Sequence, residues 1–101
     1  MKECCKTYLI GQFGDEDIIA EIYAEYVSSL AAKLAECDAA LESGDWIALD
    51  RAAHAMKGNA LAAGDNDMVE NAIALRSAAK LQERENAATI IQVLKKLSTL
   101  L

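Results

Sequence analysis

Proline is absent from this chain, and glycine occurs only five times among its 101 residues. Both residue types interrupt helices, whereas alanine and leucine, the two commonest residues here, favour them. The composition therefore argues against a β-sheet protein and against a disordered chain, and it predicts an all-α fold. The length fits a single domain spanning residues 1–101.

Positive charge is scarce as well, with 10 Lys and Arg against 16 Asp and Glu, a net charge of −6. A nucleic-acid-binding protein needs a basic face, and so does a protein that binds an anionic membrane, so both classes are disfavoured. No apolar run approaches the about 18 residues of a membrane span, and no signal peptide is visible. We expect a cytoplasmic protein whose partners are other proteins.

Cysteine is present in an odd number, as Cys4, Cys5 and Cys37. Because two of the three are adjacent, no disulfide framework is indicated, and reduced thiols are expected. A metal site at Cys4 and Cys5 would need two further ligands, and the chain has a single histidine, His54. A di-iron bundle would need several inward-facing Glu-x-x-His pairs, which one histidine does not supply. We therefore expect no metal and no cofactor.

Apolar residues recur at three- and four-residue steps in four segments, separated by Gly, Asp and Asn. The side chains of Asp15 and Asp45 are suited to begin helices, and Gly44 and Gly64 to end them. The "VSSL" stretch at 27–30 is a plausible bend in the first long helix. Short connections between amphipathic helices predict an antiparallel up-down-up-down four-helix bundle, preceded by a short N-terminal helical arm. The expected ranges are 1–12 for the arm and 15–42, 46–63, 67–82 and 86–100 for the helices.

The second long helix carries the sole histidine, and helical geometry fixes its direction. The buried face is predicted to consist of Leu49, Ala52, Ala53, Met56 and Ala60. At about 100° per residue, His54 lies about 140° from the centre of that face, with Lys57 at about 80° and Gly58 at about 180°. His54 is therefore expected to face solvent.

Two large apolar residues accompany His54 on the exposed side of this helix. Ile47 and Leu61 lie seven residues before and after it, close to two helical turns, so the three form one line. Asp50 and Arg51 flank the same line, one turn before the histidine. Apolar residues around a polar centre on an exposed face suggest a docking surface, so these four neighbours are predicted to bind a partner.

The trio of His54, Lys57 and Gly58 suits phosphoryl chemistry. A neutral imidazole has a free ring nitrogen that can attack phosphorus. The ammonium of Lys57, one turn further on, can be placed against phosphoryl oxygens. Gly58 costs about 1 kcal/mol relative to alanine inside a helix, and its missing side chain would leave the approach to the histidine open.

At these residues the sequence resembles the histidine-containing phosphotransfer (HPt) family. Its typical signature, AH-x-L-K-G-[SA]-A-x-x-L-G, is similar to "AHAMKGNALAAG" at residues 53–64. Met56, Asn59 and Ala63 replace the two leucines and the small residue of the signature. The upstream "ALESGDWIALDRAAH" also looks like the entry to that helix in the family, and the resemblance covers roughly residues 15–80. One departure bears on partner choice: Leu75-Arg76 stands where the family often has Leu-Glu.

The resemblance implies that His54 accepts a phosphoryl group from an aspartyl-phosphate on a response-regulator receiver domain and passes it to another receiver. It also implies that Lys57 stabilises the phosphoryl group and that Gly58 gives access. The Mg²⁺ for transfer would belong to the receiver, so this chain would need no cofactor of its own. Receiver domains and a hybrid sensor histidine kinase are the implied partners, and a monomer suffices.

Two further considerations define the functional class. No Gly-rich, phosphate-binding loop is present, so autophosphorylation from ATP is not expected, and the protein would be a phosphoryl carrier rather than an enzyme. The alternative is a helical adaptor that docks on a receiver domain or sensor kinase without phosphotransfer, with His54 only a contact. The short length and the lack of linkers favour a free-standing protein over a domain of a hybrid kinase.

Overall fold

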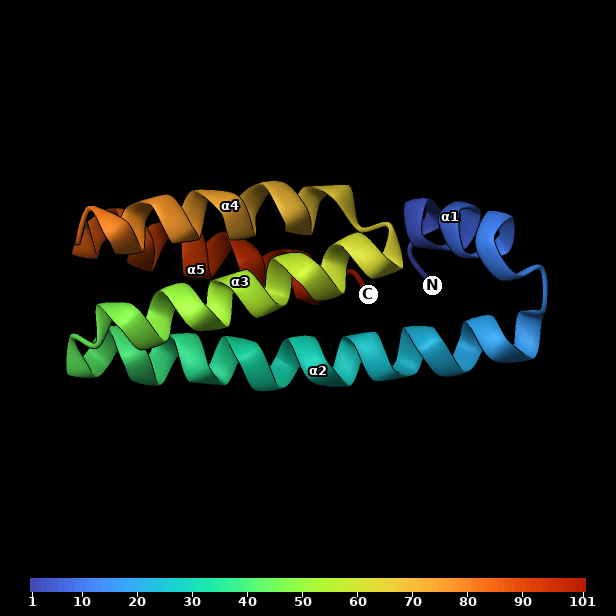
Figure 1. Cartoon of the computed structure of the whole chain (residues 1–101), viewed down its shortest axis with the longest axis horizontal. Helices are drawn as coiled ribbons and strands as arrows, with labels where there is room; N and C mark the ends of the chain where they lie inside the picture. Colours follow the sequence, from blue (N-terminus) through green and yellow to red (C-terminus); the bar gives the residue numbers. More distant parts are fainter.

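A computed structural model describes all 101 residues and contains five helices and no strand. The helices are α1 (Glu3–Phe13), α2 (Glu16–Ser43), α3 (Trp46–Ala63), α4 (Asn66–Lys80) and α5 (Arg84–Ser98) (Figure 1). The all-α prediction is confirmed, and the observed helix ends differ from the expected ones by at most two residues. No helix has both the length and the apolar character needed to cross a membrane.

The predicted helix boundaries follow from local side-chain chemistry. The carboxylates of Asp15 and Asp45 accept hydrogen bonds from backbone N–H groups in the first turns of α2 and α3. Gly44 and Gly64 end these two helices in the left-handed conformation, each with a φ of 72°. Because these residues also close the turns between successive helices, they set where the chain reverses direction.

α2 is one continuous helix of 28 residues, so the bend expected at residues 27–30 does not interrupt it. Serine can bend a helix when its hydroxyl bonds the carbonyl one turn earlier. In α2 the hydroxyl of Ser29 accepts a hydrogen bond from the side-chain amide of Asn59 in α3, at 2.9 Å. The serine therefore links α2 to α3.

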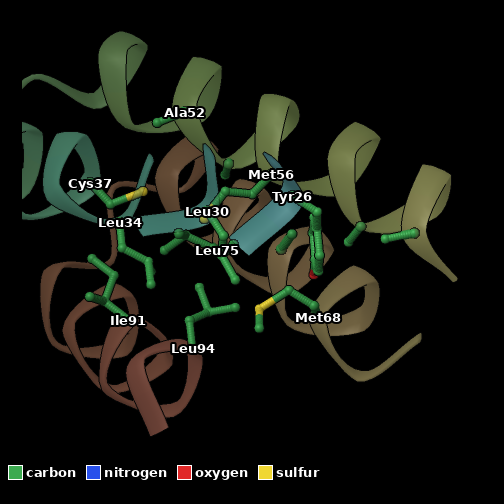
Figure 2. Packing of buried hydrophobic residues seen from close by; sticks show 14 of the residues in the cluster. Tyr26, Leu30, Leu34, Cys37, Ala52, Met56, Met68, Leu75, Ile91 and Leu94 are labelled. Carbon is green, nitrogen blue, oxygen red and sulfur yellow. The ribbon is translucent and has the colours of Figure 1, made fainter. Parts of the chain in front are cut away.

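Helices α2 to α5 pack around one apolar core, in which α3 and α5 each contact both α2 and α4. Figure 2 shows Leu30 and Leu34 of α2, Leu75 of α4 and Leu94 of α5 meeting in this core. The predicted buried face of α3 is confirmed, since all five of its expected residues are buried: Leu49, Ala52, Ala53, Met56 and Ala60. With that face inward, the opposite side of α3 is left to solvent.

The N-terminal arm is a full helix, α1, that packs beside the first half of α2 at one end of the bundle (Figure 1). Cys5 and Leu9 are its buried residues. Tyr8 lies so close to Gly64 that a methyl group at position 64 would collide with it. The end of α3 therefore carries a glycine both for its backbone conformation and for contact with α1.

One charged side chain, that of Asp65, is buried where α1 meets the bundle. Asp65 occupies the N-cap position of α4, but its side chain makes no capping hydrogen bond. It is the only buried charged residue in the chain. One carboxylate oxygen accepts a hydrogen bond from Lys2 Nζ at 2.6 Å, and the other accepts one from the Tyr26 hydroxyl at 2.7 Å. Its partners thus come from distant segments, which helical periodicity does not reveal.

Candidate functional site

His54 lies near the middle of α3 with its side chain exposed, as the helical geometry predicts. Its neighbour Ala53 is fully buried, so the backbone beneath the imidazole is held by the core. No side-chain hydrogen bond or ion pair engages the imidazole. A partner can therefore reach the ring without breaking an existing contact.

The two residues expected to assist His54 lie on the same stretch of α3. Lys57 is half-buried and makes no ion pair, so its ammonium is available to an anion brought to this surface. Gly58 is exposed, and a methyl group added there would meet nothing within 4 Å. The surface beside His54 is thus open at Gly58 and carries an unpaired cation at Lys57.

Apolar side chains are exposed on both sides of His54 along α3. Ile47 is 69% exposed and Leu61 is 52% exposed. A third apolar residue, Ile73 of α4, is 48% exposed, and the sequence does not predict it as part of this surface. The sequence does indicate that Ile73 is exposed, because it lies off the buried stripe of α4. Its position relative to α3 cannot be predicted without knowing how the two helices pack.

An ion pair between α3 and α4 shows which residues of the two helices lie side by side. Arg76 Nε lies 3.0 Å from a carboxylate oxygen of Asp50, and both side chains are partly buried. The short turn at Gly64 makes α4 run antiparallel to α3. Since Arg76 lies opposite Asp50, the residue one turn before Arg76 on α4 lies opposite the residue one turn after Asp50 on α3. This register places Ile73 level with His54, so an exposed apolar residue lies on α4 beside the histidine, in addition to the two on α3.

The Asp50–Arg76 pair also determines the charge near the histidine. Asp50 precedes His54 by one helical turn, so its carboxylate is close to any anion carried there. Arg76, at the position where the chain departs from the family signature, neutralises this carboxylate. The departure therefore has a structural counterpart beside the site. The sequence predicts that Asp50 binds a partner, whereas it gives Arg76, which pairs with Asp50, no site role.

The remaining predicted contact residues line hollows at the two ends of the exposed face. One hollow of about 260 Å³, between the start of α3 and the end of α4, is lined by Trp46, Ile47, Asp50, Arg51, Ala79, Lys80 and Gln82. The other lies between α1 and the end of α3, and both Tyr8 and Leu61 line it. His54 is on open surface between them, since neither hollow includes it.

Most of the chain is similar in sequence to one known protein family. The family model described as the Hpt domain matches residues 21–101, which include most of α2 and all of α3, α4 and α5. Searches of curated proteins and of solved structures found no match. The matched region contains His54 and its surrounding surface, and it leaves out α1. The chain belongs to the Hpt domain family, whose helical members are phosphocarriers in histidine phosphotransfer.

Proposed function

We propose that this chain is the histidine phosphocarrier of a two-component phosphorelay. In this proposal His54 takes a phosphoryl group from the aspartyl-phosphate of one receiver domain and delivers it to the aspartate of another. The observation that carries the proposal is an exposed, unpartnered imidazole on a rigid helix in a chain of the Hpt family. The scaffold is the antiparallel four-helix bundle of α2 to α5 that the sequence predicts.

The transfer step needs only a nucleophile and electrostatic support from this chain. A ring nitrogen of His54 forms a bond to phosphorus while the bond from phosphorus to the aspartate oxygen breaks, and the aspartate leaves as a carboxylate. Lys57 stabilises the negative charge of the phosphoryl oxygens, and Gly58 leaves room for the receiver to approach. Mg²⁺ would be held by the receiver, so this chain would bring no cofactor of its own.

The receiver would dock on the apolar surface around His54. Ile47, Leu61 and Ile73 surround the histidine and would be covered on docking, while Asp50 and Arg51 contribute charge at one end. Such a contact buries apolar area without moving the bundle. The same surface serves donor and acceptor receivers in turn, so a cytoplasmic monomer that meets a hybrid sensor kinase and a response regulator fits the proposal.

Incubation with a phosphorylated receiver domain and Mg²⁺ tests the proposal. We expect one acid-labile phosphoryl group per chain, mapped to His54 by mass spectrometry, and its loss on addition of a second, unphosphorylated receiver. If the receiver binds but no label is transferred, the phosphocarrier function is wrong and the adaptor function is favoured. Label at another residue would overturn the assignment of His54.

Lys57→Ala should slow transfer without loosening the fold. Removing one preorganised electrostatic contact to a reacting phosphoryl group is expected to lower the rate by about 10-fold or more. Because Lys57 makes no ion pair, its removal should change the free energy of unfolding by less than about 0.5 kcal/mol. Single-turnover transfer kinetics measure the first effect, and denaturant unfolding measures the second.

The matched control for this variant is Lys96→Ala, because Lys96 is an exposed, unpaired lysine on α5. It removes the same charge far from His54 and should leave the transfer rate unchanged. Equal slowing by both variants would indicate a general effect of net charge. Equal rates for Lys57→Ala and wild type would remove the proposed role of Lys57.

A double-mutant cycle tests the Asp50–Arg76 pair. Arg76→Gln exposes the incoming phosphoryl group to an unneutralised carboxylate, so transfer should slow by roughly fivefold, equivalent to about 1 kcal/mol. If neutralisation is the whole effect, adding Asp50→Asn should restore the wild-type rate. Persistent slowing in the double variant would instead assign Arg76 a direct contact with the phosphoryl group or the receiver. A wild-type rate for Arg76→Gln alone would refute both roles.

A further inference from the structure

A second cluster of reactive side chains lies at the opposite end of α3 from Ile47, where α1 meets the α3–α4 connection. Cys4 and Cys5 come from the first turn of α1, and Asp65 comes from the connection. Their two sulfur atoms and one carboxylate oxygen lie within 4.8 Å of one another. Cys5 and Asp65 are fully buried, and Cys4 is partly exposed. The structure thus supplies a third ligand that is distant from the cysteines in sequence.

The surroundings of Asp65 leave room for one more partner. Its oxygens accept hydrogen bonds from Lys2 Nζ and from the Tyr26 hydroxyl, and each carboxylate oxygen has a further lone pair. Lys2 also lies 3.5 Å from Asp67, so its ammonium has a second carboxylate nearby. Hydrogen bonds of this kind orient a ligating carboxylate and tune its basicity in protein metal sites.

We propose that Cys4, Cys5 and Asp65 bind one Zn²⁺ ion, with a water molecule in the fourth position on the exposed side of Cys4. Two thiolates and a carboxylate are ligands that zinc accepts in tetrahedral geometry. Binding replaces all but one of the water ligands of the hydrated ion with two Zn–S bonds and one Zn–O bond, and the released waters and the two thiol protons leave to solvent. Small side-chain movements suffice, because the ligand atoms are already gathered.

Charge balance supports zinc at this depth in the protein. Two thiolates, the carboxylate of Asp65 and the ammonium of Lys2 together carry two net negative charges, which a divalent cation cancels. A neutral cluster avoids the cost of burying an isolated charge.

The proposed ion would fasten α1 to the bundle. Cys4 and Cys5 belong to α1, which lies outside the region matched by the Hpt family, whereas Asp65 lies inside it. A metal bond between them would restrain α1 at the place where Tyr8 packs on Gly64. The site is therefore a structural clamp added to the phosphotransfer bundle, and it is independent of His54.

Titration of the reduced, metal-free full chain with Co²⁺, without a polyhistidine tag, tests the proposal. We expect one Co²⁺ per chain, a thiolate-to-cobalt absorption band and bands of tetrahedral cobalt, all removed by added Zn²⁺. Cys4→Ala and Cys5→Ala should each weaken binding by about 100-fold or more, since each removes a ligand. Cys4 is partly exposed, so its variant is expected to fold, as circular dichroism will verify.

Cys37→Ala is the matched control, because Cys37 is a buried thiol that belongs to no group of three gathered ligands. This variant and His54→Gln should bind Co²⁺ like wild type. A wild-type chain without the thiolate-to-cobalt band, or a Cys4→Ala variant that retains it, would overturn the proposal. As a second measurement, Zn²⁺ should raise the melting temperature of wild type and Cys37→Ala but not of Cys4→Ala.

Discussion

Replacing His54 by glutamine is expected to abolish phosphoryl uptake while leaving the protein folded. Glutamine is similar in size and favours helix, but its amide has no nucleophilic nitrogen to form a bond to phosphorus. His54 is the only histidine, so no second imidazole can accept the group. Its side chain is exposed and makes no polar contact, so the free energy of unfolding should change by less than about 0.5 kcal/mol.

The measurement is transfer of radiolabelled phosphate from a phosphorylated receiver, with circular dichroism and receiver binding recorded on the same samples. The variant should bind the receiver through Ile47, Leu61 and Ile73 yet carry no acid-labile label. This combination separates the loss of a nucleophile from the loss of a docking surface. Acid-labile label on the variant would show that another residue accepts the phosphoryl group.

The sequence predicts where the central candidate residues lie on the surface, because they are close together on one helix. His54, Lys57 and Gly58 span barely more than one turn of α3, so their relative directions depend only on helical geometry. The same local rules predict Asp45 at the start of α3 and Gly64 at its end. These features need no knowledge of how the helices pack.

Features that depend on packing could not be predicted in this way. Ile73 and Arg76 lie beside the candidate site because α4 packs against α3 in one particular register. The ion pair between Arg76 and Asp50 shows this register, which the helical periodicity of the sequence does not predict. In the sequence, Asp65 resembles an ordinary helix cap. Only the position of the N-terminal segment shows that its carboxylate is paired with the ammonium of Lys2 instead. A helix pattern predicts which residues turn inward, but not which distant residues they meet.

Gly64→Ala is expected to destabilise the protein strongly, by about 2–5 kcal/mol in the free energy of unfolding. The φ of 72° costs a residue with a side chain about 1–2 kcal/mol. The new methyl group would also collide with Cβ of Tyr8, so α1 would have to move, which adds about 1–3 kcal/mol. Thermal unfolding should show a loss of roughly 4–8 °C for each kcal/mol.

Two other glycines provide controls that separate the causes. Gly44 has the same φ of 72°, but a methyl group there meets only Arg84 Nη2 at 3.5 Å, so Gly44→Ala should lose the conformational part alone. Gly58 is in the interior of α3 with nothing nearby, so Gly58→Ala should gain about 1 kcal/mol of stability. The difference in stability loss between Gly64→Ala and Gly44→Ala measures how firmly α1 is packed on the bundle. Equal stability losses for Gly44→Ala and Gly64→Ala would mean that α1 moves away from position 64 at no cost.

If Gly58→Ala is more stable than wild type but transfers phosphate more slowly, the glycine at this position is needed for a partner to approach.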